Sequence, residues 1–112
     1  MTTEQNWQTI CHKNDLVKHS GICALLENEE QIAIFQLNET TAYSVSNWDP
    51  IGQANVLSRG IIGDSQGELF VASPLYKQRF SLNTGRCLDD ESITIKSYQV
   101  RIVEDKVQVS LI

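Results

Sequence analysis

The stretch from Glu68 to Gly85 restricts the possible folds more than any other part of this 112-residue chain. It begins with the most apolar strand candidate, turns at Pro74, returns through Phe80 and Leu82, and closes on a Thr84-Gly85 turn. A proline between two apolar segments, followed by a glycine turn, is typical of a strand, a loop and a second strand. The stretch therefore predicts β structure built around a loop.

Short strands separated by turn signals are expected along the rest of the chain. The expected strands are residues 6–11 at a sheet edge, residues 22–26 and 31–37 as a hairpin buried on both faces, residues 41–46, and residues 98–102 and 107–111 joined by a tight Glu104-Asp105 turn. No long amphipathic helix is expected, only one helical turn capped by Asn14 and ended by Gly21. This pattern predicts an all-β chain folded as an antiparallel sandwich or barrel.

Length and charge restrict both the organisation and the partners of the chain. Residues 1–112 are enough for one domain with a single hydrophobic core, and no apolar run approaches the roughly 20 residues that span a bilayer. The net charge of −5 disfavours nucleic acid and anionic membranes as partners. The first residues lack the features of a signal peptide, and the three cysteines are widely spaced, so we expect a cytoplasmic protein with reduced thiols.

The proline loop resembles the second cluster-binding loop of Rieske iron-sulfur domains, Cys-Pro-x-His-Gly-x-x-Phe followed by Thr-Gly. Pro74, Phe80 and Thr84-Gly85 match this pattern, and Pro50 lies where the first Rieske loop is expected. The resemblance implies an all-β, Rieske-like antiparallel β sandwich in which residues 47–87 form a small loop-bearing subdomain. The stretch between the two loops is long, so an extra turn is expected around residues 53–59.

The four positions that this resemblance aligns with cluster ligands hold other residues. Asp49 and Ser73 stand for the cysteines, and Ile51 and Tyr76 stand for the histidines, while Lys77 replaces the glycine. A Rieske [2Fe-2S] centre needs two thiolates and two imidazoles, which these side chains cannot supply. The resemblance therefore implies a domain without a metal, a bound cofactor or a catalytic residue of its own.

Over nearly its full length the chain also resembles the small subunit of NAD(P)H-dependent assimilatory nitrite reductase. The strings that carry this resemblance are Asp49-Pro50, Val56-Leu57-Ser58-Arg59-Gly60, Gly67-Glu68-Leu69, Val71-Ala72-Ser73-Pro74-Leu75 and Lys77-Gln78-Arg79-Phe80. That family implies a large-subunit partner that holds FAD, sirohaem and a [4Fe-4S] cluster and reduces nitrite to ammonium. The small chain would be a non-redox subunit that supports or regulates the large one.

Two other functions are also compatible with the sequence. One is a stand-alone Rieske-fold domain that binds another protein without redox activity. The other is an active Rieske ferredoxin, which predicts a coloured, iron-containing protein.

The loop tips are the candidate docking surface for a partner. The residues expected there are Trp48, Leu75, Tyr76, Lys77, Arg79 and Arg86. Exposed Trp and Tyr are typical of interface hot spots, and the three basic side chains gather on the second loop and its return strand. The alternatives are that side chains of the loops turn inward to fill the space of the absent cluster, which is favoured for Ile51 and open for Tyr76, and that the basic residues are ordinary surface charge.

The remaining chemistry-bearing residues match no known catalytic or metal-binding pattern. Cys11-His12 with His19 and Cys23 lacks zinc or iron-sulfur spacing, so Cys11 is expected to pack at a strand end. Cys87 follows Arg86, which could lower a thiol pKa, but no histidine is near it in sequence, and a buried thiol is the simpler interpretation. The acidic run of residues 89–91 is expected to be a solvated turn rather than a metal site.

Overall fold

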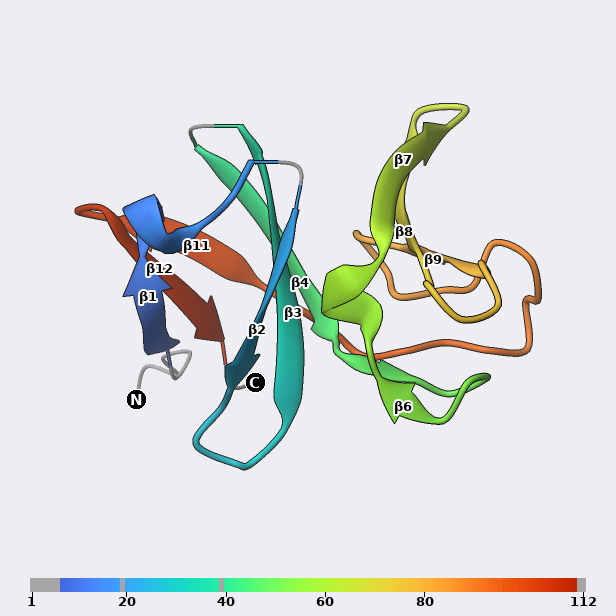
Figure 1. Ribbon diagram of the computed structural model, residues 1–112. Coiled ribbons are helices and arrows are strands. Elements are labelled where there is room, and N and C mark those ends of the chain that lie inside the picture. Colours follow the sequence, from blue (N-terminus) through green and yellow to red (C-terminus); the bar gives the residue numbers. More distant parts are fainter. Residues whose placement is uncertain (1–6, 19, 39, 111–112) are drawn as a thin grey trace, which may run out of the picture.

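The computed structural model describes residues 7–18, 20–38 and 40–110, and this part of the chain consists of short strands and two single turns of 3-10 helix (Figure 1). The elements are β1 (Trp7–His12), η1 (Lys13–Asp15), β2 (Gly21–Leu25), β3 (Gln31–Asn38), β4 (Thr41–Ser46), β5 (Trp48–Asp49), β6 (Ala54–Asn55), η2 (Leu57–Arg59), β7 (Ile61–Ser65), β8 (Glu68–Ala72), β9 (Arg79–Ser81), β10 (Ser97–Tyr98), β11 (Val100–Val103) and β12 (Lys106–Ser110). The all-β prediction is confirmed. No helix within the described ranges is long and apolar enough to cross a bilayer.

These strands form antiparallel sheets with the orders β1-β12-β11, β10-β4-β3-β2, β5-β6 and β7-β8-β9. The first strand lies at a sheet edge, as predicted, because it pairs only with β12. The predicted tight hairpin between β11 and β12 is also confirmed. Both turn residues have positive φ, 50° at Glu104 and 65° at Asp105, which is the backbone of a two-residue hairpin turn that matches strand twist.

Strand β3 is buried on both faces and contributes to two separate hydrophobic clusters. Ala33 and Phe35 pack in a cluster with side chains of β4, β8 and β9, whereas Ile32 and Ile34 pack against Val107 and Val109 of β12. Successive side chains of a strand point to opposite faces, so a strand that serves two cores needs an unbroken apolar run. This explains the run of residues 32–35.

The prediction that both strands of the 22–37 hairpin are buried is wrong for β2. Leu25 is 60% exposed, and β2 forms the outer edge of its four-stranded sheet. The apolar composition of residues 22–26 resembles that of a central strand, but only the register with β3 decides which face meets a core.

The helical turn after β1 begins two residues earlier than expected, because its N-cap is His12 instead of Asn14. Nδ1 of His12, rather than Asn14, caps it by accepting a hydrogen bond of 3.1 Å from the Asn14 N–H, and Asp15 Oδ2 accepts one of 2.9 Å from the His12 N–H. Gly21 opens β2 instead of ending a helix. The extra turn expected around residues 53–59 is confirmed by β6 and η2.

Figure 1 shows β7, β8 and β9 on one side of the sheet that contains β3 and β4, with β1, β11 and β12 on the other side. This arrangement agrees with the two clusters that share β3. The boundaries 47–87 for a separate subdomain stay a prediction.

Candidate docking site at two proline loops

The two proline-bearing loops lie side by side, although 24 residues separate their key positions. We define loop 1 as residues 47–53, which follow β4, and loop 2 as residues 73–79, which join β8 to β9. A Cβ atom on Gly52 would lie 2.4 Å from Cδ1 of Leu75, so the loops touch where loop 1 has no side chain. A side chain at this position would require the exposed Leu75 side chain to move aside.

Asp49 is the centre of the contact and has no exposed surface. Its Oδ1 atom accepts hydrogen bonds from the backbone N–H groups of Ile51, at 2.9 Å, and Gly52, at 3.1 Å. Its Oδ2 atom accepts a hydrogen bond of 2.5 Å from the hydroxyl of Ser73, which is 1% exposed. A buried carboxylate requires such partners, and these three donors hold loop 1 closed on itself and against loop 2.

Loop 2 has its own internal hydrogen bonds around Ser73. The Ser73 N–H donates to the Gln78 carbonyl at 2.9 Å, and the Lys77 N–H donates to the Ser73 carbonyl at 3.0 Å. Lys77 has a φ of +63°, the left-handed backbone that glycine adopts most easily. The Rieske pattern has a glycine here, which indicates that loop 2 keeps the backbone of that pattern without its glycine.

These side chains do not fit a [2Fe-2S] cluster. Asp49 and Ser73 are oxygen groups already bonded to each other, where two thiolates would be needed. Ile51 is partly buried and packs against the hydrophobic cluster of β4, β8 and β9, while Tyr76 is 64% exposed. Neither supplies an imidazole, and within the described residues no group of three His, Cys, Asp or Glu side chains could hold a metal ion.

The loop tips expose three large apolar or aromatic side chains. Trp48 of loop 1 is 43% exposed, and Leu75 and Tyr76 of loop 2 are 46% and 64% exposed. Ile51 instead packs inward. The structure thus places Tyr76, for which the sequence leaves both orientations open, on the surface.

The two arginines of the predicted patch are already paired. Arg79 makes a two-pronged contact with Asp89, with Nη2–Oδ1 at 2.8 Å and Nε–Oδ2 at 3.3 Å, and Arg86 Nη2 lies 3.0 Å from Glu91 Oε1. The hydrogen bond from Arg79 lowers the pKa of the Asp89 carboxyl, and the same bond raises the pKa of Arg79. The acidic turn therefore neutralises both guanidinium groups. Lys77, the third cation of the predicted patch, has no carboxylate partner among the residues that the structure describes.

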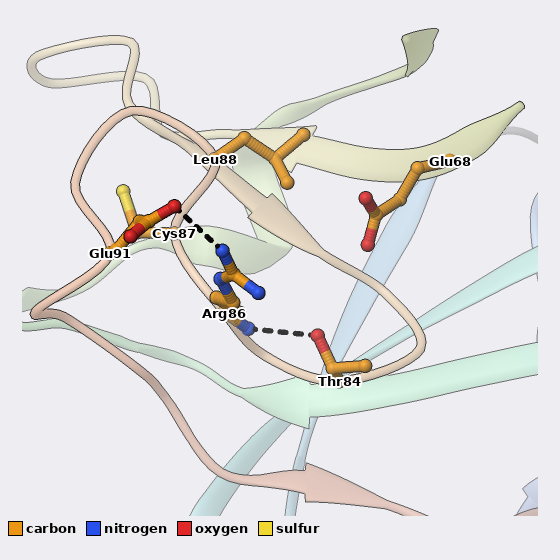
Figure 2. Close-up of a pocket in the computed structure, with 6 residues that line it drawn as sticks. All are labelled: Glu68, Thr84, Arg86, Cys87, Leu88 and Glu91. Atoms are coloured by element: carbon orange, nitrogen blue, oxygen red, sulfur yellow. Dashed lines mark hydrogen bonds and ion pairs between the residues drawn. The ribbon is translucent and has the colours of Figure 1, made fainter. Parts of the chain in front are cut away.

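A hollow of about 250 Å³ lies beside Cys87. Figure 2 shows the residues that line it, namely Cys87, Glu68, Thr84, Arg86, Leu88 and Glu91. Cys87 itself is fully buried and belongs to the hydrophobic cluster of β4, β8 and β9. A thiol in that position packs as a small apolar side chain. Arg86 is turned to Glu91, and its backbone N–H donates to Thr84 Oγ1 at 3.2 Å.

The cysteines of the Cys11, His12, His19 and Cys23 group differ in their burial. Cys11 is partly buried against the hydrophobic cluster that contains Val107 and Val109 of β12, and this burial raises the pKa of its thiol. Cys23 is exposed and donates a 3.5 Å hydrogen bond to Gln31 Oε1. His19, the fourth member, lies outside the described residues.

Sequence reasoning missed Asn47, which anchors loop 1 to the rest of the fold. This side chain is 1% exposed; its Oδ1 accepts a 2.7 Å hydrogen bond from the Ser58 N–H, and its Nδ2 lies 3.3 Å from Gln31 Oε1. Asn47 therefore ties loop 1 both to β3 and to η2. A polar residue at the end of an apolar strand is the only signal, and it also fits an ordinary surface turn.

No sequence motif indicates the hollow of about 370 Å³ that lies at the base of loop 2. It is lined by Arg59, Ile61, Ala72, Ser73, Pro74 and Lys77. Gly60 brings the η2–β7 corner against β8, since a Cβ there would lie 2.4 Å from the Ala72 carbonyl oxygen. This close approach forms the hollow from segments that are distant in sequence.

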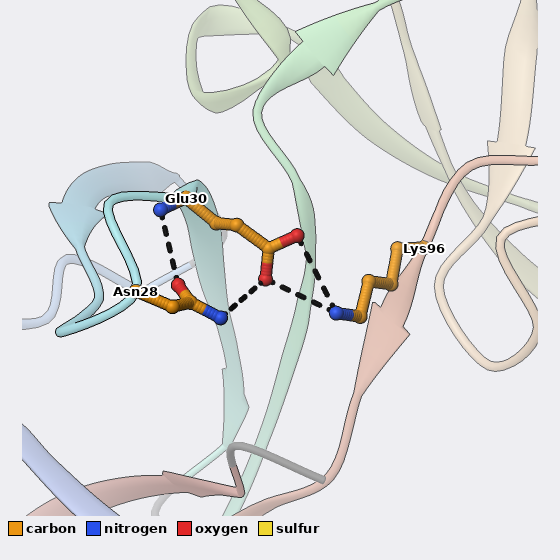
Figure 3. A network of polar contacts seen from close by, with 3 residues as sticks. All are labelled: Asn28, Glu30 and Lys96. Atoms are coloured by element: carbon orange, nitrogen blue, oxygen red, sulfur yellow. Dashed lines mark hydrogen bonds and ion pairs between the residues drawn. The ribbon is translucent and has the colours of Figure 1, made fainter.

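A further polar network joins the β2–β3 turn to the segment before β10 (Figure 3). Lys96 Nζ lies 3.0 and 3.4 Å from the two Glu30 carboxylate oxygens, and Asn28 Nδ2 donates to Glu30 Oε1 at 2.8 Å. The hydrogen bond from Lys96 lowers the pKa of Glu30. Burial, together with the charge of Glu30, raises the pKa of Tyr98. Lys96 Nζ lies over the ring of Tyr98, 5.1 Å from the ring centre.

Comparison with known proteins shows similarity over almost the whole chain. The model of the Rieske-like [2Fe-2S] domain family matches residues 6–110. The nitrite reductase (NADH) small subunit of Escherichia coli K12 is 45% identical over 104 residues, which cover 92% of this chain and 95% of that one. The NMR structure of the E. coli protein NirD matches with a TM-score of 0.86 and 44% identity, covering 96% of this chain and 97% of that chain.

Two further comparisons extend this similarity. In Klebsiella oxytoca, a protein named nitrite reductase [NAD(P)H] large subunit is 42% identical over 103 residues, which cover 92% of this chain but 11% of that protein. A ferredoxin of carbazole 1,9a-dioxygenase from Nocardioides aromaticivorans shares the fold with a TM-score of 0.77 at 16% identity, covering 93% and 96% of the two chains. The predicted Rieske-like fold is therefore confirmed.

Proposed function

Because this chain belongs to the Rieske-like family of nitrite reductase (NADH) small subunits, we propose that it is a non-redox subunit that docks on a separate catalytic large subunit. The large subunit would carry FAD, sirohaem and a [4Fe-4S] cluster and would reduce nitrite to ammonium with electrons from NAD(P)H. This chain would support assembly of that enzyme or regulate it. Both would work in the cytoplasm, where NAD(P)H is available.

The observation that carries this proposal is the Klebsiella relative. There the corresponding segment occupies 11% of a protein named as the large subunit, so domain and enzyme are one polypeptide. When the domain and the enzyme are covalently linked, each is present at a high effective concentration near the other. Where the domain is a separate chain, the same association must come from a non-covalent interface.

The geometry of the loops supports the non-redox part of the proposal. The Ser73 hydroxyl donates a hydrogen bond to the Asp49 carboxylate between the loops, and Ile51 packs against the core. In Rieske domains the same loops present the cluster to an electron partner. We propose that here they retain only the docking role, with Trp48, Leu75, Tyr76 and Lys77 as contacts, and that Arg79 and Arg86 mainly hold the acidic turn through Asp89 and Glu91.

A co-purification experiment tests this proposal. The affinity-tagged large subunit of the same organism should retain this chain in a stable complex, and the purified chain alone should contain no iron and show no visible absorption. A wild-type chain that does not associate with the large subunit would refute the subunit role and favour a free-standing binding domain. Stoichiometric iron with Rieske-type absorption would refute the non-redox role.

A further inference from the structure

The hollow at the base of loop 2 combines an apolar wall with two cationic side chains. Ile61, Ala72 and Pro74 provide the apolar part, and Arg59 and Lys77 also line it. Ile61 is 75% exposed, the most exposed of the large apolar side chains within the described ranges. A volume of about 370 Å³ lies at the low end of the roughly 300–1,000 Å³ typical of ligand pockets, so it suits one or two side chains of a partner.

The charges at this hollow differ from those of the rest of the protein. The chain has a net charge of −5, yet no carboxylate lines the hollow. Arg79, Arg86 and Lys96 each have a carboxylate partner, whereas Arg59 and Lys77 have no carboxylate of the described residues within 4.0 Å. Two unpaired cations beside an exposed apolar side chain favour a ligand with both an anionic and an apolar group.

We infer that this hollow is the anchor point of the subunit interface and that it receives an acidic segment of the large subunit carrying an apolar side chain. The inference rests on the proposed function, since it names the chemistry of the partner surface. The apolar side chain would lie on Ile61 and Pro74, and flanking carboxylates would pair with Arg59 and Lys77. A second copy of this chain is a poorer occupant, because two copies with a net charge of −5 repel each other.

Affinity measurements with the intact large subunit test the inference. Arg59→Glu/Lys77→Glu and Ile61→Asp should each weaken binding at least about tenfold, which is the scale of an interface hot spot. Lys106→Glu and Leu25→Ser are matched controls, because they change one exposed cation and one exposed leucine away from the loops, and they should bind like wild type. The milder Arg59→Gln/Lys77→Gln variant should bind more weakly than wild type and depend less on salt.

The possible outcomes separate the inference from the proposed function. Thermal unfolding first checks that the site variants are folded. If they then bind as well as wild type, the hollow is not the anchor, but the subunit role stands. If wild type does not bind, the subunit role fails and the inference fails with it. If sedimentation shows that the chain alone forms a dimer that Ile61→Asp dissolves, the occupant is a second copy and the assignment to the large subunit is overturned.

Discussion

The hydroxyl of Ser73 donates a hydrogen bond to the buried carboxylate of Asp49, and this bond joins the two loops. In the Rieske pattern the same two positions hold cysteines that share one iron. The loops of this chain are thus held together by a pair of oxygen groups instead of a metal. Asp49 contributes more than Ser73, because it also accepts the N–H groups of Ile51 and Gly52.

Asp49→Ala should therefore lower the free energy of unfolding by about 2–4 kcal/mol, since it leaves one buried and two partly buried donors without an acceptor. Ser73→Ala should cost less, about 1–2 kcal/mol, because the Asp49 carboxylate keeps its two backbone donors. Urea unfolding measures both, and the double variant should be less destabilised than the sum of the single variants. Strict additivity would show that the two residues do not interact in solution.

Restoring the four ligand types tests the assignment of the replaced positions. The variant Asp49→Cys/Ile51→His/Ser73→Cys/Tyr76→His, reconstituted with iron and sulfide, should show the visible absorption of a Rieske centre. The matched control lacks only the Tyr76→His change and should not give that spectrum. If the four-residue variant binds no iron while remaining folded, the assigned positions are wrong.

The backbone of Lys77 gives a prediction that separates folding from binding. Because its φ is +63°, Lys77→Gly should leave the free energy of unfolding unchanged or raise it by up to about 1 kcal/mol. The same change at Lys106, in strand β12, should lower it by about 1 kcal/mol. Chemical denaturation of both variants provides the comparison, and a clear loss of stability in Lys77→Gly would contradict the left-handed conformation.

Two carboxylates predict how stability responds to acid. Hydrogen bonds from Lys96 and Arg79 lower the pKa values of Glu30 and Asp89 in the folded state. A lowered folded-state pKa adds stability above the unfolded pKa, near 4.5 for Glu and 3.8 for Asp, which is lost as the pH falls through the folded value. The free energy of unfolding should therefore decrease below about pH 5, and less steeply in Glu30→Gln and Asp89→Asn.

The size of this acid effect is limited by solvent. The side chains of both pairs are more than a third exposed, so solvent screens both contacts and the effect should be small, and 1 M salt should reduce it further. Glu104→Gln, in the exposed β11–β12 turn, serves as the control. Identical pH profiles for Glu30→Gln and wild type would show that the Lys96 contact does not persist in solution.

The thiols should react in the order of their exposure. A thiol reagent should modify the exposed Cys23 first, the half-buried Cys11 more slowly, and the fully buried Cys87 only when the protein opens. Labelling followed by mass spectrometry measures the order. Rapid modification of Cys87 in the native protein would revive the nucleophilic role that its neighbour Arg86 suggests.

Local patterns in the sequence were enough to predict most strands and the hairpin at Glu104-Asp105. Alternation and turn residues are properties of neighbours in the chain, and they also placed the edge strand β1. The exposure of Leu25 and the pairing of Arg79 with Asp89 could not be predicted in this way. Both depend on contacts between separate segments, namely the register of β2 on β3 and the fold of the acidic turn against β9.

The candidate site shows the same division. Asp49 and Ser73 could be identified by alignment with a known pattern, but their mutual hydrogen bond requires the loops to meet in space. The hollow beside Ile61 had no sequence signal at all, because Ile61-Ile62 looks like a short strand with no preferred face. Only the packing of Ile62 on the core leaves Ile61 outside.

The double burial of β3 also bears on how such a domain can be moved between polypeptides. Since Ala33 and Phe35 belong to one core and Ile32 and Ile34 to the other, we expect both halves to unfold together. The chain should behave as one indivisible cassette. We therefore expect such a domain to keep its structure both as a separate chain and as a segment of a longer enzyme.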